Sequence, residues 1–566
     1  CVRTLRKKGL RLDILINKGE IMNKKIMLIA SSALTFGLMG CTTTTPPNVE
    51  QIDKTKTQIF VNNYDGGYGS EWLSKVKERF EELHKDDVIE EGKKGIQVYI
   101  NNKKQTADAV APNILTGRDE VYFTEQSSYY SLRSQGILGE ITDAVSDTLD
   151  EYGETRSVLD KMTKEQKDFF GVTETDGKAH YYAMPHYSGF FGLTYNVDLF
   201  EERGFYFAMT PTGNNLADKF VSKKNIKKSL GPDGVAGTSD DGLPTTYDEF
   251  FELCKYIDNR GCTPFLSNGK NSKDYLNLLV NSLATNYEGK DEMTKVFTCQ
   301  GEVNTLATIK NGELVMDENP TIKFLRTIVD NNSYHNDKMT NTGYSHTDAQ
   351  RDFLYAGYDG TTNPIAMLSD GIWWQNEAKS VFSQMVDSKG EDFSAAKRKF
   401  AFMPLPQPTK EKAESTKKTT LYDHLFSFCF MKANVADAKK PIIKEFIKFC
   451  NTDLSLQEFT VTTNTPKALD YPMSEEDLSQ MTYYGRSLYE RKAASDIVYP
   501  YASSSLFANN QSRFHTNDQY YTKVNSKDNQ YVITGLTDLN YSAETYFSGM
   551  YTYWQNEWGR LTGVND

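Results

Sequence analysis

Cysteine is scarce in this chain of 566 residues, and the spacing of its seven cysteines excludes the usual cysteine-based sites. No CxxC pair occurs, and no cysteines and histidines show the spacing of a zinc site. Five cysteines follow Cys41, an odd number that cannot all pair within one chain. Cys429 and Cys450 lie in apolar surroundings, which predicts small buried hydrophobes. Cys254 and Cys262 either bond to each other or stay free.

Signature motifs of several enzyme classes are also missing. There is no GxSxG around a serine, no HExxH and no GxxxxGK[ST]. Gly66, Gly67 and Gly69 precede a predicted helix, but the other residues of a phosphate-binding loop are absent. We therefore expect a tight loop whose backbone approaches a ligand.

Positive charge is in deficit, because the chain has a net charge of −12. The first 40 residues carry +6, so the remainder carries −18. Such an acidic surface repels phosphate backbones, which argues against nucleic acid as a partner. After residue 40 no apolar run approaches the ~18 residues of a membrane-spanning helix. The length and the polar, Tyr- and Asn-rich composition predict a globular chain with at least two lobes.

The N-terminal region has the pattern of a secretory signal. Lys24 and Lys25 precede an uncharged, largely apolar stretch at residues 26–38, and Cys41 follows soon after. This stretch is shorter than the ~20 residues that span a bilayer. A cysteine after a small residue resembles a lipobox, in which lipid is attached to the cysteine and the chain is cut before it. We predict lipidation of Cys41; an ordinary secretory signal or a chance cysteine is the alternative.

Three segments are therefore expected before the globular part. Residues 1–21 are interpreted as leader upstream of the true start at Met22, because Lys18, Gly19 and Glu20 back-translate to a purine-rich stretch typical of a ribosome-binding site. Residues 22–40 are the predicted signal peptide. Residues 41–56, with the sequence TTTTPP near their start, are predicted to be a flexible tether.

Strand and helix patterns alternate from residue 57 onward. Strands are predicted at 58–61, 95–101, 121–124, 364–370, 399–406 and 425–431. Helices are predicted at 70–83, 126–133, 246–257 and 436–450, and a last one from residue 542. In the first helix, Ser70 is the expected cap and Leu83 the last residue of the apolar face. The alternation predicts α/β layers, interrupted at 208–244 by an inserted loop.

The inserted loop contains a group of acidic residues that suggests a metal site. Asp233, Asp240 and Asp241 lie among glycines, and oxygen-rich loops of this kind suit Ca²⁺. The loop departs from the EF-hand pattern at Val235 and Gly237. A solvated turn is the alternative interpretation.

Six stretches of the chain resemble one protein family. They are YYAMPHYSGFFGLTYNVDLFEERG, GLPTTYDEFFELC, CTPFLSNG, PIAMLSDGIWWQNEA, KFAFMPLPQP and AKKPIIKEFIKFCNT. In this order, behind a lipobox, they resemble the extracellular carbohydrate-binding proteins of bacterial ABC importers, the superfamily that includes maltose-binding protein. The resemblance runs from about residue 57 to residue 510.

The resemblance implies an α/β fold with two lobes, a ligand cleft between them and hinge strands that cross from one to the other. By this analogy, residues 57–185 and 425–468 form the first lobe. Residues 186–424 and 469–566 form the second.

Polar and aromatic side chains follow the predicted strands, at the edge where open α/β sheets bind ligands. Flat rings cover the C–H face of a neutral sugar, whereas carboxylates and amides bind its hydroxyl groups. The candidate ligand-binding residues are Asn62, Tyr64, Asp65, Glu125, Tyr187, Trp373 and Trp374. The resemblance implies that Glu125 binds sugar hydroxyls and that Trp373 or Trp374 stacks on a sugar ring.

Several of these candidates also have a purely structural interpretation. Tyr64 could pack on its own loop, Glu125 could be a solvated helix cap, and Tyr187 could lie away from the cleft. One of Trp373 and Trp374 is expected in the core, because adjacent side chains point apart.

The resemblance implies a non-catalytic receptor that captures a mono- or oligosaccharide and delivers it to an ABC permease. It would be a monomer at the outer face of a bacterial membrane, attached through its lipid alone. No cofactor is expected beyond the Ca²⁺ considered above. The alternatives are an extracellular glycoside hydrolase and a receptor for peptides or another small solute.

Overall fold

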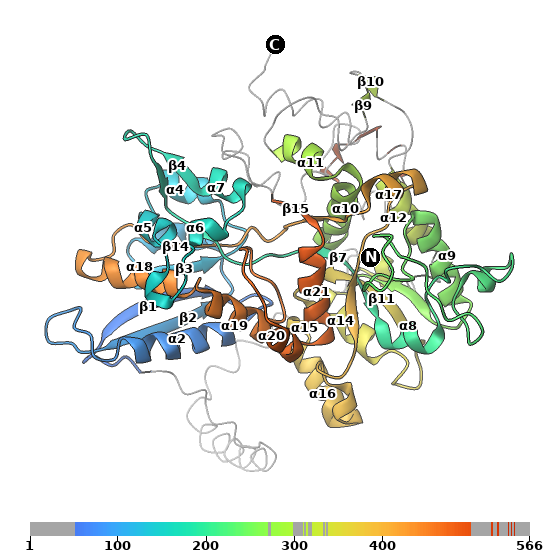
Figure 1. Cartoon of the computed structure of the whole chain (residues 1–566), viewed down its shortest axis with the longest axis horizontal. Helices are drawn as coiled ribbons and strands as arrows, with labels where there is room; N and C mark the ends of the chain where they lie inside the picture. The colour runs from blue at the N-terminus through green and yellow to red at the C-terminus, as the bar shows by residue number, and fades with distance from the viewer. Residues whose placement is uncertain are drawn as a thin grey trace, which may run out of the picture. The chain divides into compact units, whose positions relative to one another are not determined.

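The computed structural model describes most of the chain after residue 50 (Figure 1). The described residues are 51–269, 273–297, 309–310, 313–314, 320–331, 334, 338–499, 522–523, 529–530, 541–542, 545 and 548–549. The predicted leader and signal peptide, Cys41 and nearly all of the predicted last helix lie outside them. Within these ranges, no helix combines the length and apolar character that a transmembrane segment requires.

The first sheet has five strands in the order β2-β1-β3-β14-β6. Its strands are β1 (Thr57–Tyr64), β2 (Ile96–Lys103), β3 (Val121–Thr124), β6 (Met184–Pro185) and β14 (Phe428–Met431). β1 pairs in parallel with β2 and β3, whereas β14 is antiparallel to β3 and β6. The predicted strands at 58–61, 95–101 and 121–124 are confirmed. β14 enters this sheet from a distant part of the sequence.

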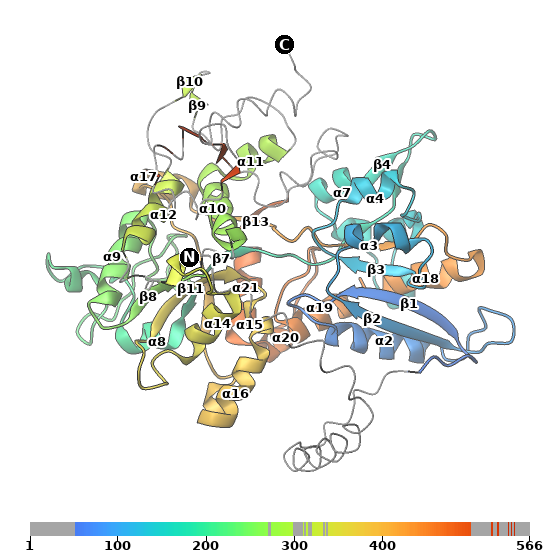
Figure 2. The ribbon, with the colours of Figure 1, turned by 180° about the vertical axis from the view of Figure 1, so that it is seen from behind.

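Helices cover this sheet on both sides. On one side α2 (Glu71–Leu83) buries Trp72, Val76 and Phe80, and α19 (Asp453–Thr463) packs beside it. Figure 2 shows α3 (Ala107–Ile114) on the other side. Ser70 is the N-cap residue, as predicted, although its side chain makes no capping hydrogen bond. The prediction was wrong for Leu83, which is 54% exposed at the end of the helix and does not belong to its buried face.

The helix predicted from residue 126 begins later, as α4 (Tyr129–Ser134). Ser128 is its N-cap, and its side chain accepts a hydrogen bond from the backbone N–H of Ser131. Gln126 cannot belong to the helix, because its φ of +50° lies in the left-handed region. The chain therefore makes a sharp turn directly after β3.

The second sheet has four strands in the order β12-β7-β11-β8. They are β7 (Phe191–Asn196), β8 (Thr263–Leu266), β11 (Ile365–Gly371) and β12 (Phe400–Met403). β11 is parallel to β8 and antiparallel to β7. All four strands are buried throughout, which explains their continuous apolar runs. The helices packed on this sheet are α8 (Val197–Arg203), α9 (Tyr247–Asp258), α10 (Lys273–Glu288), α14 (His346–Tyr355) and α21 (Tyr483–Ala493).

The chain passes between the two sheets more than once. It leaves the first sheet after β6 and enters the second at β7, so residues 186–190 form the connection. It returns between β12 and β14. Two isolated β-bridges hold the connecting segments together: Tyr187 pairs with Lys467, and Phe190 pairs with Asp423.

The remaining elements are mostly short. The helices are α5 (Thr142–Ser146), α6 (Val158–Lys161), α7 (Lys164–Phe170), α11 (Lys290–Phe297), α12 (Pro320–Asp330), α15 (Trp374–Glu377), α16 (Lys379–Lys389), α17 (Lys410–Thr416), α18 (Lys440–Phe449) and α20 (Glu475–Gln480), with 3-10 turns at Asp150–Tyr152, Leu216–Lys219, Lys338–Thr340, Glu391–Phe393 and Asp437–Lys439. The strands are β4 (Gly171–Thr173), β5 (Ala179–Tyr181), β9 (Ile309–Lys310), β10 (Glu313–Leu314), β13 (Thr420–Tyr422), β15 (Asp496–Val498), β16 (Thr522–Lys523) and β17 (Asn529–Gln530).

The four cysteines among the described residues behave as small hydrophobes. Cys429 and Cys450 are buried, as predicted. Cys254 and Cys262 are buried and free, so the interpretation that they form a disulfide was wrong. Burial raises the pKa of both thiols, which keeps them protonated and unreactive.

Candidate ligand-binding site

Glu125 directly follows β3 and is only 7% exposed. The Tyr187 hydroxyl donates a hydrogen bond to Glu125 Oε2 at 2.6 Å. Burial raises the pKa of Glu125 to about 7, although hydrogen bonds from Tyr187 and Tyr64 act in the opposite direction. Glu125 is therefore not the solvated helix cap of the alternative interpretation. It is a buried acceptor held by two phenols.

The backbone around Glu125 is fixed from a distant part of the chain. The N–H of Gln126 donates to the carbonyl of Leu425 at 3.0 Å, and Ser427 Oγ donates to the carbonyl of Thr124 at 2.9 Å. The left-handed φ of Gln126 is unfavourable for a side chain of this type. These contacts hold the strained turn, and the turn presents Glu125 at the end of its strand.

The glycine loop after β1 lies against both sheets' side chains. A Cβ added at Gly66 would lie 2.7 Å from a Tyr64 ring carbon and 3.6 Å from Glu125 Oε1. A Cβ added at Gly67 would lie 2.7 Å from the Cβ of Trp373. Only glycine leaves room for the backbone to lie this close to Tyr64 and Trp373. Close packing therefore accounts for Gly66 and Gly67, and a phosphate-binding role is not needed to explain them. The loop thus brings Tyr64 and Glu125 close to Trp373.

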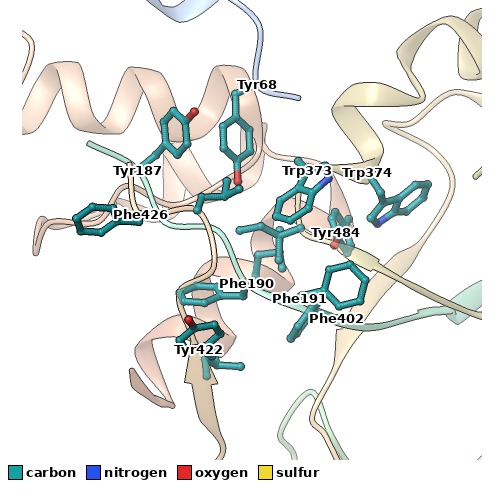
Figure 3. Close-up of a cluster of buried hydrophobic side chains, with 14 of the residues drawn as sticks. Tyr68, Tyr187, Phe190, Phe191, Trp373, Trp374, Phe402, Tyr422, Phe426 and Tyr484 are labelled. Atoms are coloured by element: carbon teal, nitrogen blue, oxygen red, sulfur yellow. The ribbon is translucent and has the colours of Figure 1, made fainter. Parts of the chain in front are cut away.

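The two tryptophans after β11 point apart (Figure 3). Trp373 is 8% exposed, and its Nε1 donates to the Tyr275 hydroxyl at 3.3 Å. Trp374 is fully buried and packs edge-on against Phe400 and Tyr484. Trp374 therefore belongs to the core of the second sheet, and the structure offers no support for a ligand contact by this residue. Trp373 faces the site.

Two other candidate ligand-binding residues, Asp65 and Asn62, make no contact with Glu125 or Trp373 that the structure records. Asp65 is exposed, and its backbone N–H donates to the carbonyl of Lys103. Asn62 is buried, but its Nδ2 donates to Asp119 Oδ2 at 3.0 Å. Asn62 and Tyr64 point to the same face of β1, yet Asn62 lies two residues further from the strand end.

Several residues of the site were missed by the sequence reasoning. Gln350 Nε2 donates to both Asp370 Oδ2, at 2.9 Å, and Glu377 Oε2, at 2.8 Å. Burial has the largest effect on the pKa of Tyr64 and raises it, and the charges of Glu125 and Glu377 raise it further. Both carboxylates therefore lie near the Tyr64 hydroxyl. A local signal existed only for Asp370 and Glu377, which flank the tryptophans in sequence.

Tyr68 and Tyr275 extend the aromatic part of the site. Tyr68 packs edge-on against Tyr187 with ring centroids 4.5 Å apart, and its hydroxyl donates to the carbonyl of Ser188 (Figure 3). Tyr275 stacks on His346 at 4.9 Å. Burial strongly raises the pKa of both tyrosines, so they remain neutral donors. Such neutral donors, flat rings and carboxylate acceptors match the hydroxyls and C–H faces of a sugar.

The predicted metal ligands already have partners in their own loop. Asp240 Oδ2 accepts from the backbone N–H of Asp233, and Asp241 Oδ2 accepts from the backbone N–H of Gly237. Arg491 lies 3.9 Å from Asp240. In the described part of the chain, no group of three or more His, Cys, Asp or Glu side chains has a metal-binding arrangement. The calcium hypothesis gains no support here and stays a prediction.

No family model matches the sequence, and no curated protein matches it. Solved structures do match. A chitin oligosaccharide binding protein matches with a TM-score of 0.53 and 16% identity, covering 89% of this chain and 99% of that one. The GacH receptor of Streptomyces glaucescens, solved unliganded and with acarbose, matches with a TM-score of 0.53 and 12% identity, covering 90% and 100%.

A third match is the SBP RafE in complex with raffinose, with a TM-score of 0.51, 14% identity and coverage of 88% of this chain and 99% of that one. Because the matches extend over nearly the whole of each solved chain, they concern the entire fold and not one sheet. They confirm the predicted fold class. The chain has the two-lobed α/β fold of extracellular solute-binding proteins.

Proposed function

We propose that this protein is an extracellular receptor that captures a mono- or oligosaccharide and delivers it to an ABC importer, without making or breaking a bond. The observation that carries the proposal is the grouping of Tyr64, Glu125 and Tyr187 with Trp373 around the glycine loop. Proteins of the same fold that bind chitin oligosaccharide, acarbose and raffinose support it.

In this proposal the groups of the site have different roles. Trp373 stacks on the C–H face of a sugar ring, and Glu125 accepts hydrogen bonds from its hydroxyls. Tyr64 and Tyr187 hold the Glu125 carboxyl in place. The backbone of residues 66–67 closes the space above them, where a side chain would collide with Tyr64 or Trp373.

We further propose that residues 57–185 and 425–468 form one lobe and residues 186–424 and 469–566 the other. Ligand binding would favour the closed arrangement, because only then do both lobes contact the sugar. The bridges from Tyr187 to Lys467 and from Phe190 to Asp423 support a hinge in the connecting segments. The hydroxyl of Tyr187 reaches Glu125, so the hinge and the site share a residue.

The proposed receptor is a monomer held at the outer face of a bacterial membrane by lipid on Cys41. Its partner in the membrane is the permease. The basis for the anchor is the pattern at residues 24–41 of the sequence. Mass spectrometry of the protein purified from bacterial membranes should find a lipid-modified N-terminal Cys41. A mature chain that starts elsewhere, without lipid, would contradict the anchor.

Thermal shift with a saccharide panel tests the binding function. The panel contains chitin oligosaccharides, raffinose and maltose, added to the chain that begins after Cys41. A ligand that binds only the folded state at 100 times its Kd stabilises the fold by about 2.7 kcal/mol, which raises Tm. Absence of any shift with saccharides, combined with a shift for peptides, would refute the saccharide proposal.

The two tryptophans provide a matched pair of variants. Trp373→Ala should weaken saccharide binding by about 2 kcal/mol, or roughly 30-fold in Kd, and should also lower Tm, because its side chain is only 8% exposed. Trp374→Ala should instead lower the free energy of unfolding by about 3–5 kcal/mol, because it leaves a cavity in the core. Isothermal titration and urea unfolding of both variants measure the two effects. Equal affinity of Trp373→Ala and wild type would refute the stacking role.

A further inference from the structure

A cavity lies on the first sheet, on the side covered by α3. It has a volume of about 350 Å³, which falls within the usual range of small-molecule pockets. The strands contribute Asn62, Asn101 and Tyr122, which are neighbours in the register of β1, β2 and β3. Val110 and Ile114 of α3 supply an apolar wall. The cavity therefore combines a polar floor with an apolar side.

A carboxylate in this cavity is held rigidly by neutral groups. Asp119 is 8% exposed, and its Oδ2 accepts hydrogen bonds from Asn62 Nδ2 at 3.0 Å and Asn101 Nδ2 at 2.8 Å. Within the described ranges, no lysine or arginine forms an ion pair with Asp119. A carboxylate oriented by two amides at the wall of a cavity is a fixed hydrogen-bond acceptor for a ligand.

The neighbouring residue supplies an equally fixed cation. The guanidinium of Arg118 lies over the ring of Phe60 at 4.5 Å and over the ring of Tyr99 at 4.6 Å. These two contacts hold an otherwise exposed side chain in one place at the cavity. Asn113, also exposed, lines the rim from the end of α3. Planar donors and acceptors thus face the same space from several directions.

This cavity differs from the candidate ligand-binding site. Tyr64, Glu125 and Trp373 do not line it. Asp119 precedes β3 and Glu125 follows it, so the two carboxylates are up to about 20 Å apart along an extended chain.

We propose that this cavity is a second binding site, which takes a single sugar unit. Carboxylate, amide and guanidinium groups are planar and can each bind two neighbouring hydroxyls, and Val110 and Ile114 cover the C–H face. The cavity is large enough for one ring. The site goes beyond the proposed function, because it binds its ligand independently of the site at Trp373.

Isothermal titration with monosaccharides tests the second site. The probes are D-glucose, D-galactose, N-acetylglucosamine and D-glucuronate, titrated into wild type and three variants. Asn113→Trp fills the rim of the cavity, Asn113→Ala is its matched control at the same exposed position, and Trp373→Ala removes the other site. We expect Asn113→Trp to weaken binding of at least one probe by about tenfold or more, with little change in Asn113→Ala and Trp373→Ala.

The outcomes separate the two sites. Loss of monosaccharide binding in Trp373→Ala but not in Asn113→Trp, or no binding of any probe to wild type, would overturn the second site. Binding that is lost only in Asn113→Trp supports it, even if no oligosaccharide binds at Trp373 and the proposed function fails. If Asn113→Trp does not fold by circular dichroism, Asp119→Asn, which keeps the size of the side chain, replaces it with the same expectation.

Discussion

His186 and Tyr187 are neighbours in the segment that connects the two sheets, yet they belong to two different polar clusters. The Tyr187 hydroxyl donates to Glu125 at the candidate ligand-binding site. The ring of His186 instead lies on the other side, where its Nδ1 is 2.7 Å from Lys467 Nζ. Lys467 is enclosed by the rings of Trp72, at 4.7 Å, and Phe459, at 4.2 Å. One cluster borders a loop that a ligand can approach, and the other is enclosed.

Burial acts on the two clusters in opposite directions. It raises the pKa of the Glu125 acid to about 7, and it lowers the pKa of the Lys467 amine to about 7. It also lowers the pKa of His186 far below its usual value, so the imidazole is neutral. In each case desolvation disfavours the charged form. Desolvation of Glu125 therefore makes stability fall as pH rises, whereas desolvation of Lys467 makes stability rise with pH.

Replacing the enclosed amine should have the largest effect. In wild type, the unfolded chain binds one more proton than the native protein between pH 7 and 10.5, because Lys467 is neutral only when folded. Stability should therefore rise with pH across this window, by about 5 kcal/mol from this residue. Lys467→Met should remove this rise. Urea unfolding at several pH values measures it, and an unchanged slope in the variant would show that the native amine is already solvated.

Replacing the site carboxyl should have a smaller effect of opposite sign. Between pH 4.5 and 7 the native protein retains the Glu125 proton that the unfolded chain has lost, so stability falls as pH rises through this window. Glu125→Gln should remove about 3 kcal/mol of this fall. Asp423, whose pKa burial also raises to about 7, acts in the same direction, so the difference between variant and wild type is the quantity to measure. If both curves fall equally, Glu125 is not desolvated.

Removing the shared hydroxyl should have the smallest effect. Tyr187→Phe deletes the donor to Glu125 but keeps the ring that packs on Tyr68, so saccharide affinity should fall by about 1 kcal/mol. The pH dependence between 7 and 10.5, to which the buried amines of Lys467 and Lys492 both contribute, should stay the same. Titration calorimetry measures the saccharide affinity, and urea unfolding of the same preparation measures the pH dependence of stability. A change in the alkaline window would mean that the two clusters are coupled.

The local pattern of the sequence predicted much of the fold. The apolar runs at β1, β2, β3, β11 and β14 formed strands, and the glycines after β1 formed a tight loop. Local pattern did not predict features that depend on contacts between residues far apart in the sequence. Leu83 is 54% exposed although it continues the apolar face of α2 in sequence, and the Asn62 side chain donates a hydrogen bond to Asp119, 57 residues away. A buried lysine such as Lys467 has no sequence signal, since its burial depends on the rings of Trp72 and Phe459.

The sequence alone determined the strands, the helices and the kinds of side chain at the strand ends, because hydrophobic periodicity and strand termini are properties of neighbouring residues. Only the tertiary structure decided which tryptophan faces the site and which residues hold Glu125. Trp373 and Trp374 are chemically identical, and packing against Tyr484 and Phe400 separates them. Glu125 and Tyr187 are 62 residues apart, so their hydrogen bond exists only because two sheets share the segment that connects them.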